Sequence, residues 1–314
     1  MTDSPWQSVG PDYLVAGRYR LRSKLGGGGM GSVWLAHDRL LDRAVALKQI
    51  TSTVGLSAAE ADDLRSRAIR EGRIAAKLSN AHTIAMYDVA LERGEPWLVM
   101  EYLPARSIAE ALNVADVLDP VEVAQIGAQV ADALAEAHEA GIVHRDIKPG
   151  NILVADRGPS AGLVKISDFG IAQATGERDA DRPGVITGTL AYFAPEVARG
   201  HDPTPASDVF SLGSTLYTAV EGRPPFGFDD QPAMLDGIAR GQIIPPERAA
   251  ELTPVLLHLL EPDPARRPTM AQARDELVVA VGSPADVPEA LRWAPTRLVR
   301  IRFETLVEWS AKDR

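Results

Sequence analysis

The chain has 314 residues, of which 45% are hydrophobic and 24% charged, and its formal net charge is −10. A globular protein with one large domain or two lobes has this length and composition. The acidic balance argues against a general nucleic-acid-binding protein, because phosphate backbones select clustered Lys and Arg. The absence of cysteine excludes disulfides, thiolate metal sites and cysteine nucleophiles.

The N-terminus has neither a basic start nor an apolar run, so it does not look like a signal peptide. Nowhere does the sequence contain the roughly 18 consecutive apolar residues that a membrane-spanning helix needs. We therefore expect a cytoplasmic protein, in which residues 1–17 form an N-terminal extension.

A glycine-rich turn follows the first predicted strand. Strand-like residues 18–25 lead into it, and residues 32–36 alternate as a second strand. The pattern G-x-G-x-x-G-x-V is formed by Gly26, Gly28, Gly31 and Val33. Such glycines let backbone approach a phosphate without an intervening Cβ. Dinucleotide-binding folds share part of this pattern but continue into a helix, and a plain flexible turn is an equally good interpretation of the motif alone.

The next predicted strand, residues 43–48, ends in Lys48, which by itself would be read as a solvated lysine. A helix is predicted from Ser57 to about residue 78, because Ser57 and Glu60 form a capping box. Glu71 falls within the apolar stripe of this helix, where an unpaired carboxylate would be costly. Its candidate partners are Lys48 and Arg67, one turn earlier.

A buried strand that ends in a turn is predicted at 97–104, and beyond it the chain becomes helical, with a long amphipathic helix at 120–140 closed by Gly141. Residues 144–151 then read HRDIKPGN, and residues 168–170 read DFG. Together they supply a carboxylate base, a cation and two oxygen ligands for a metal. Phosphoryl transfer from ATP needs little else from a protein, because positioning and charge stabilisation dominate its catalysis.

On these motifs the chain resembles the bacterial eukaryotic-type serine/threonine protein kinases, from about residue 18 to about 282. The resemblance implies an α+β, bilobal fold. Residues 18–102 would form a small antiparallel-sheet N-lobe with one key helix, and residues 103–282 a larger, mainly helical C-lobe. Residues 283–314 would be a C-terminal tail.

The resemblance also implies an ATP site in which Lys48 contacts the α- and β-phosphates and pairs with Glu71. Val33 and Ala46 would cover the adenine, the backbone at Glu101 and Leu103 would hydrogen-bond it, and Met100 would guard the inner pocket. The implied ATP-binding residues are Leu25, Gly26, Gly28, Gly31, Val33, Ala46, Lys48, Glu71, Met100, Glu101, Leu103 and Leu153.

Within the catalytic loop, the resemblance makes Asp146 the base that accepts the proton of the attacking hydroxyl. Lys148 would neutralise the transferring phosphoryl group. Asn151 and Asp168 would bind Mg²⁺, with Mn²⁺ as an alternative. A lysine at position 148 is typical of kinases that phosphorylate Ser and Thr, and Thr189, expected to contact Asp146 and Lys148, points the same way.

Three further residues are expected to be structural: Asp208 should hold the backbone of the catalytic loop, and Glu196 should pair with Arg267. In kinases of this family, the arginine that corresponds to Arg145 usually binds a phosphothreonine of the activation segment. Here residues 180–185 contain no hydroxyl. Autophosphorylation at Thr175 or Thr187 is the hypothesis we favour; acidic residues replacing a phosphate, or a plain solvated acidic loop, are the alternatives.

The resemblance implies protein substrates and phosphorylation in signalling. A pseudokinase-type scaffold that binds ATP without catalysing is the alternative, weakened by the presence of Lys48, Asp146, Asn151 and Asp168. Small-molecule kinases of similar architecture lack the Ala-Pro-Glu segment found at 194–196. The tail is expected to pack on the kinase or on a protein partner rather than on a membrane, and a homodimer is left open.

Overall fold

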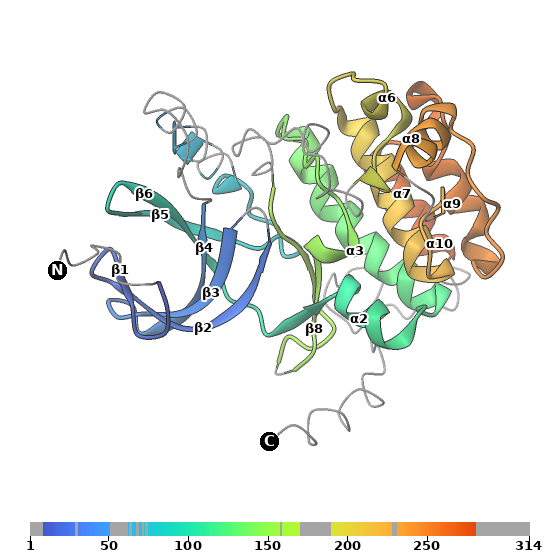
Figure 1. Cartoon of the computed structure of the whole chain (residues 1–314). Coiled ribbons are helices and arrows are strands. Elements are labelled where there is room, and N and C mark those ends of the chain that lie inside the picture. The colour runs from blue at the N-terminus through green and yellow to red at the C-terminus, as the bar shows by residue number, and fades with distance from the viewer. Residues whose placement is uncertain are drawn as a thin grey trace. The chain divides into compact units, whose positions relative to one another are not determined.

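The antiparallel sheet expected in the N-terminal part is present in the computed structural model, with the strand order β1-β2-β3-β4-β6-β5 (Figure 1). Its strands are β1 (Leu14–Val15), β2 (Tyr19–Gly28), β3 (Gly31–Asp38), β4 (Arg43–Gln49), β5 (Met86–Glu92) and β6 (Glu95–Glu101). The structure describes residues 9–28, 31–50, 62, 65–66, 69–70, 72, 75–157, 159–169, 190–227 and 231–280.

The described residues divide into two compact units. The first holds the residues up to Ser79 together with Ile84–Leu103, and the second holds Asn80–Thr83 and the chain from Pro104 onward. The α+β class expected from the sequence is confirmed, because the first unit is built on the sheet and the second is mainly helical. The lobe boundaries drawn from the sequence stay a prediction.

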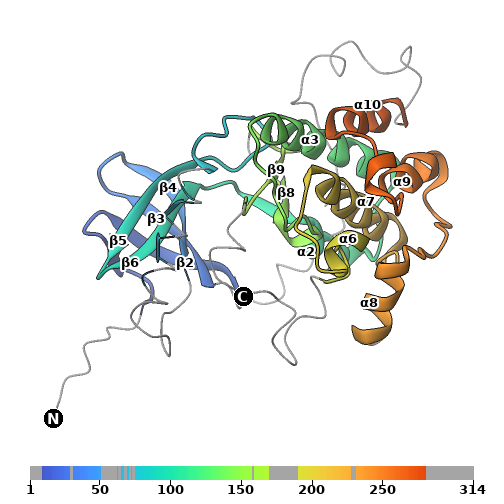
Figure 2. The same ribbon diagram turned by 90° about the horizontal axis from the view of Figure 1, so that it is seen from above.

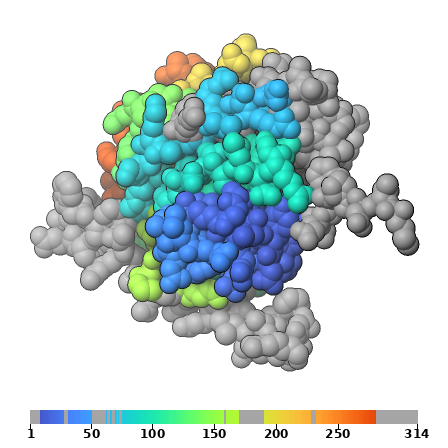
Figure 3. Space-filling model, turned by 90° about the vertical axis from the view of Figure 1, so that its left-hand side faces the viewer, coloured from blue at the N-terminus to red at the C-terminus, as the bar shows by residue number. Residues whose placement is uncertain are grey.

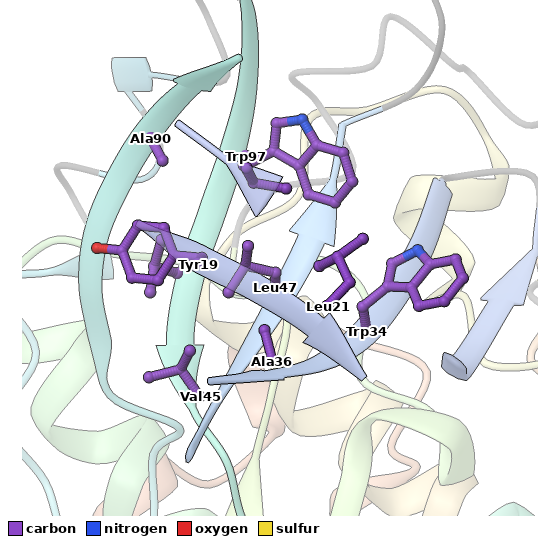
Figure 4. Close-up of a cluster of buried hydrophobic side chains, with 10 residues drawn as sticks. Tyr19, Leu21, Trp34, Ala36, Val45, Leu47, Ala90 and Trp97 are labelled. Atoms are coloured by element: carbon purple, nitrogen blue, oxygen red, sulfur yellow. The ribbon is translucent and has the colours of Figure 1, made fainter. Parts of the chain in front are cut away.

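One face of the sheet carries the larger of its hydrophobic clusters, and the alternation of side chains along the strands explains its composition (Figure 4). Trp34 and Ala36 of β3 meet Val45 and Leu47 of β4 on this face, together with Trp97 of β6. Val45, Leu47 and Trp97 are nearly inaccessible to solvent. The intervening residues of β4 and β6 therefore point to the opposite face, where Ala46, Leu98 and Met100 form a second cluster.

Strands β2 and β3 form a hairpin whose last pair is Gly28 and Gly31, as expected for a glycine-rich loop between strands and not for a loop that opens a helix. Gly31 has a φ of 114°, which a residue with a Cβ rarely adopts. At the other end of this hairpin, Arg18 binds Asp38 through two hydrogen bonds of 2.7 and 2.8 Å.

Helical residues between positions 62 and 75 lie beside the sheet. Figure 3 shows them in light blue next to the teal strands β5 and β6. Gly72 is buried, and a Cβ added there would lie 3.0 Å from Val89 and 3.2 Å from Leu98. The helix thus approaches the sheet more closely than an alanine at position 72 would allow without a shift.

The second unit begins with a small sheet of β7 (Ala105–Ser107), β8 (Ile152–Ala155) and β9 (Val164–Ile166), in that order. Its helices include α2 (Ile108–Ala115), α3 (Pro120–Glu139), α6 (Pro195–Ala198), α7 (Pro205–Glu221), α8 (Gln231–Arg240), α9 (Thr253–Leu259) and α10 (Met270–Ala280). Short 3-10 turns lie at Pro149–Asn151, Ala250–Leu252 and Pro264–Arg266.

Helices α3 and α7 form the centre of the second unit, and α10 packs along α3 (Figure 2). Asp119 caps the N-terminus of α3, and Gly141, with a φ of 73°, follows its end, as the sequence predicts. Glycines allow close contact here, because a Cβ at Gly127 would lie 2.6 Å from Leu216 and one at Gly213 would lie 2.8 Å from Leu259.

Candidate active site

The carboxylate of Asp146 is held by two side chains of the loop that follows it. Lys148 Nζ lies 2.9 Å from Oδ1 and 2.8 Å from Oδ2. Asn151 Nδ2 donates to Oδ2 at 2.9 Å and to the backbone oxygen of Asp146 at 2.7 Å. Asp146 and Asn151 are both buried. The loop therefore brings the base, the cation and one metal ligand expected from the sequence into a single cluster.

Asn151 is linked to the neighbourhood of Asp168 through the β8–β9 ladder. The backbone oxygen of Asn151 accepts hydrogen bonds from Ser167 N at 2.9 Å and from Ser167 Oγ at 3.2 Å. Asn151 immediately precedes β8, and Asp168 follows Ser167 directly. The two expected metal ligands thus leave adjacent strands at the same end.

This donor set fits Mg²⁺. Because Asn151 Nδ2 is bound to Asp146, the amide oxygen is the group that would face a metal, and Asp168 would contribute a carboxylate. Hard oxygen ligands suit this ion, which is commonly held by one or two protein groups together with substrate phosphates. Among the described residues, no group of three or more His, Asp or Glu side chains forms a metal site on its own.

Asp208, at the start of α7, holds the backbone of the catalytic loop. Its Oδ2 accepts a hydrogen bond from His144 N at 2.7 Å, and its Oδ1 accepts one from Arg145 N at 2.9 Å. His138 Nε2, in the last turn of α3, donates to the same Oδ2 at 2.8 Å. A buried carboxylate needs such donors, because its desolvation is otherwise uncompensated.

The His144 ring connects the catalytic loop to the segment that ends in Asp168. Its Nδ1 accepts a hydrogen bond of 3.2 Å from Asp146 N, so the ring proton lies on Nε2 and is donated to Ser167 O at 2.9 Å. The ring is fully buried and packs against Phe169, with 4.6 Å between ring centroids. His144 is thus a structural link between the two segments that carry Asp146 and Asp168.

Of the nucleotide-binding residues expected in the first unit, Val33, Ala46, Lys48 and Met100 lie on the sheet face opposite the larger cluster. Lys48 pairs with Val33 across β3 and β4 and is only 4% exposed, so it is not a solvated strand-end lysine. Ala46 and Met100 are partners across β4 and β6 on this face. Leu25 is 45% exposed.

The backbone expected to contact adenine begins at Glu101, the last residue of β6. Glu101 N donates to Ala85 O at 2.9 Å, and Glu101 Oε2 accepts a hydrogen bond from Ala85 N at 3.2 Å. Leu103 comes two residues later, and Leu153 lies in β8 of the second unit, paired with Ser107 and Lys165.

Glu196 and Arg267 form the expected pair, with Oε1 to Nη1 at 2.7 Å and Oε2 to Nη2 at 2.8 Å. Burial opposes ionisation of Glu196, but the hydrogen bonds from Arg267 and Ser207 outweigh it and lower its pKa below the usual value. The guanidinium also lies over the Phe210 ring, 4.9 Å from its centroid. The buried, bidentate ion pair therefore joins α6 to the turn that precedes α10.

Some expected residues lie outside the described part of the chain: Glu71, Thr175, Thr187, Thr189 and the tail at 283–314. Their assigned roles stay predictions. Arg145 is described and has a φ of 71°. His138 is a functional residue that the sequence motifs do not predict, although it lies four residues after the buried Leu134, at the end of the apolar stripe of α3.

A family model described as the protein kinase domain matches residues 19–278. The chain belongs to the protein kinase domain family. Among similar kinases, the serine/threonine-protein kinase drp72 of Corynebacterium efficiens is 36% identical over 268 residues, which are 82% of this chain and 48% of the relative. PknA of Mycobacterium tuberculosis is 37% identical over 267 residues, 82% of this chain and 58% of the relative.

PrkC of Bacillus subtilis, another serine/threonine-protein kinase, is 36% identical over 212 residues, 68% of this chain and 32% of the relative. This kinase domain thus spans only about a third to three-fifths of the length of these relatives. No helix in the described part of this kinase is long and apolar enough to cross a membrane.

Proposed function

We propose that this kinase domain transfers the γ-phosphoryl group of ATP to serine and threonine hydroxyls of proteins. The observation that carries the proposal is the cluster of Asp146, Lys148 and Asn151, with all three side chains joined by hydrogen bonds of 2.9 Å. It combines a proton acceptor, a cation and a metal-binding amide, which are the groups that in-line phosphoryl transfer requires.

In this proposal Asp146 orients the incoming hydroxyl and accepts its proton as the Pγ–O bond forms and the bond to ADP breaks. Its hydrogen bonds to Lys148 and Asn151 fix the direction of its oxygens. Lys148 compensates charge on the transferred group. Asn151 and Asp168 would hold Mg²⁺ or Mn²⁺, which when bound neutralises the phosphate oxygens. Lys48, buried on the sheet face of the first unit, would hold the α- and β-phosphates.

Ser/Thr specificity is supported by the lysine at position 148 and by the printed names of the relatives, which are serine/threonine kinases. Lys148 shares Asp146 with the incoming hydroxyl, so it would lie beside the acceptor side chain. Autophosphorylation at Thr175 or Thr187, with Arg145 binding the phosphate, belongs to the same proposal. The proposal also includes protein substrates in the cytoplasm and a docking role for residues 283–314.

The test is transfer of ³²P from labelled ATP to the chain itself and to a generic basic protein, with Asp146→Asn as the matched inactive variant. We expect labelling of serine and threonine by the wild type in the presence of Mg²⁺, and its loss in Asp146→Asn. Equal labelling by Asp146→Asn would mean that a contaminating kinase did the work. Intact-mass analysis after incubation with Mg-ATP tests the autophosphorylation sites.

An ATP-binding scaffold without catalysis is the second candidate, and the buried contacts of Asp146 argue against it. A scaffold gains nothing from a buried carboxylate and a buried amide held together beside a partly buried lysine, because such polar groups are costly to bury. Nucleotide binding without transfer by the phosphorylated and the unphosphorylated wild type would favour the scaffold.

A further inference from the structure

Strand β9, which leads to Asp168, is bound on both of its edges. On one edge it pairs with β8, as Ile152 pairs with Ile166. On the other edge lies the segment Asn80–Thr83, which belongs to the same compact unit although it precedes β9 by about 80 residues. Thr83 forms a parallel bridge with Ile166, and Ile166 N donates to His82 O at 2.9 Å.

Two buried polar side chains add to these backbone contacts. His82 is fully buried, and its Nδ1 donates to Val164 O at 2.9 Å, because a carbonyl oxygen only accepts. Lys165 is 7% exposed, and its Nζ donates to Thr83 O at 2.9 Å. Each residue of the three-residue strand β9 therefore hydrogen-bonds the segment 80–83.

The segment 80–83 is itself fixed to helix α3. Asn80 Nδ2 donates to Glu136 Oε2 at 2.9 Å and to Asp132 Oδ2 at 3.3 Å, while Asn80 Oδ1 accepts a hydrogen bond from His82 N at 2.7 Å. Arg274 of α10 donates to Asp132 at 3.1 Å. The contacts of β9 thus extend to α3, at the centre of the second unit.

β9 ends at Ile166, and Asp168 follows two residues later, after Ser167 has bound the backbone of Asn151. A shift of β9 along its axis would therefore move Asp168 relative to Asn151. A strand of only three residues has few ladder hydrogen bonds to resist such a shift. Side chains that bind its carbonyl oxygens and the neighbouring backbone supply additional resistance.

We propose that His82 and Lys165 are positioning residues for the metal-binding carboxylate: by binding the segment 80–83 to β9, they hold Asp168 opposite Asn151. This inference rests on the proposed function, since it takes Asn151 and Asp168 as the metal ligands. A buried histidine and a buried lysine are expensive compared with apolar residues of similar volume, so their contacts should provide more than stability.

The experiment compares His82→Leu, which removes the Nδ1 donor, with His82→Asn, whose Nδ2 lies near the position of Nδ1 and keeps it. Lys165→Met removes the second donor and keeps the aliphatic stem. In each full-length variant, Mg²⁺ is titrated at a fixed, saturating concentration of a non-hydrolysable ATP analogue. The readout is the rise in melting temperature, and nucleotide binding in EDTA serves as the control.

We expect His82→Leu and Lys165→Met to need about tenfold more Mg²⁺ for half-maximal stabilisation, the lower end of the effect of residues that orient metal ligands. Nucleotide binding in EDTA should be unchanged, and His82→Asn should titrate as the wild type does. A lower melting temperature with an unchanged Mg²⁺ midpoint in both His82→Leu and Lys165→Met would mean a purely structural role and overturn the proposal.

If His82→Leu does not fold, the Mg²⁺ midpoint of Lys165→Met alone tests the positioning role. Wild type that binds Mg²⁺ with the nucleotide but transfers no phosphate would overturn the proposed function and leave the positioning role standing. Wild type that shows no Mg²⁺-dependent stabilisation would overturn both, because Asn151 and Asp168 would then not bind the metal.

Discussion

Asp208 binds the backbone N–H of Arg145 at 2.9 Å, and Arg145 has a φ of 71°. A non-glycine residue with such a φ is strained by about 1–3 kcal/mol. The charge-assisted hydrogen bond to Asp208 offsets this cost, and it comes from a helix 63 residues further along the chain. The strained peptide immediately precedes Asp146, so the direction of the base depends on Asp208.

Asp208→Asn should therefore lower phosphoryl transfer more than it lowers ATP binding. The amide keeps one acceptor oxygen but cannot accept from His144 N, Arg145 N and His138 at once. We expect kcat to fall by up to about 100-fold, the effect of misplacing a catalytic group by an ångström. Steady-state kinetics test this expectation, and an unchanged kcat would show that the loop keeps its conformation without the carboxylate.

The contact between His138 and Asp208 gives a second prediction. His138→Leu removes a donor to a buried carboxylate, which costs about 1.5–3 kcal/mol, whereas His138→Gln keeps a donor at similar reach. We expect His138→Leu to lower both stability and kcat, with KM for ATP unchanged, and His138→Gln to restore most of both. Equal loss in the two variants would indicate that the shape of the ring matters and not its hydrogen bond.

The pair Arg18–Asp38 predicts a pH dependence of stability. The hydrogen bonds from Arg18 hold the pKa of Asp38 at about 2, below its ordinary value. Because the pKa in the folded state is depressed, this pair stabilises the fold fully above the ordinary carboxyl pKa of about 4. The contribution is lost as the pH falls from about 4 to 2.

Arg18→Met should consequently lower the free energy of unfolding at pH 7, and the partial exposure of the guanidinium limits the effect. The difference from the wild type in the free energy of unfolding should shrink towards pH 2. Denaturant titrations at several pH values measure it. A difference that stays constant with pH would mean that Arg18 acts through packing on Tyr19, not through its charge.

Two helical glycines should respond in opposite directions to alanine. At Gly127 in α3 the added Cβ would lie 2.6 Å from Leu216, so Gly127→Ala should destabilise by about 1–3 kcal/mol. At Gly237 in α8 the nearest atom, of Phe226, is 3.9 Å away, so Gly237→Ala should stabilise by up to about 1 kcal/mol. Thermal unfolding of both variants measures these changes, and the result for Gly127→Ala tests whether α3 and α7 are as close as described.

Local sequence was enough to predict the features that depend on neighbouring residues. The hairpin around the glycines, the strand that carries Lys48 and the end of α3 before Gly141 follow from alternation, backbone freedom and capping. Asp146, Lys148 and Asn151 lie within six residues and were assigned from the motif. Their side chains meet in the structure because one short loop carries them all.

The pair Glu196–Arg267, 71 residues apart, was expected from the family resemblance, but other contacts between distant residues were decided only by the tertiary structure. His138 lies 70 residues from Asp208, and His82 lies 82 residues from Val164. No sequence pattern predicts the partner of either histidine. The periodicity of hydrophobic residues indicates which face of an element a residue occupies, but not which residue packs against that face. A carboxylate or a carbonyl oxygen that is buried away from water needs a hydrogen-bond donor. The fold places these two histidines where such donors are required.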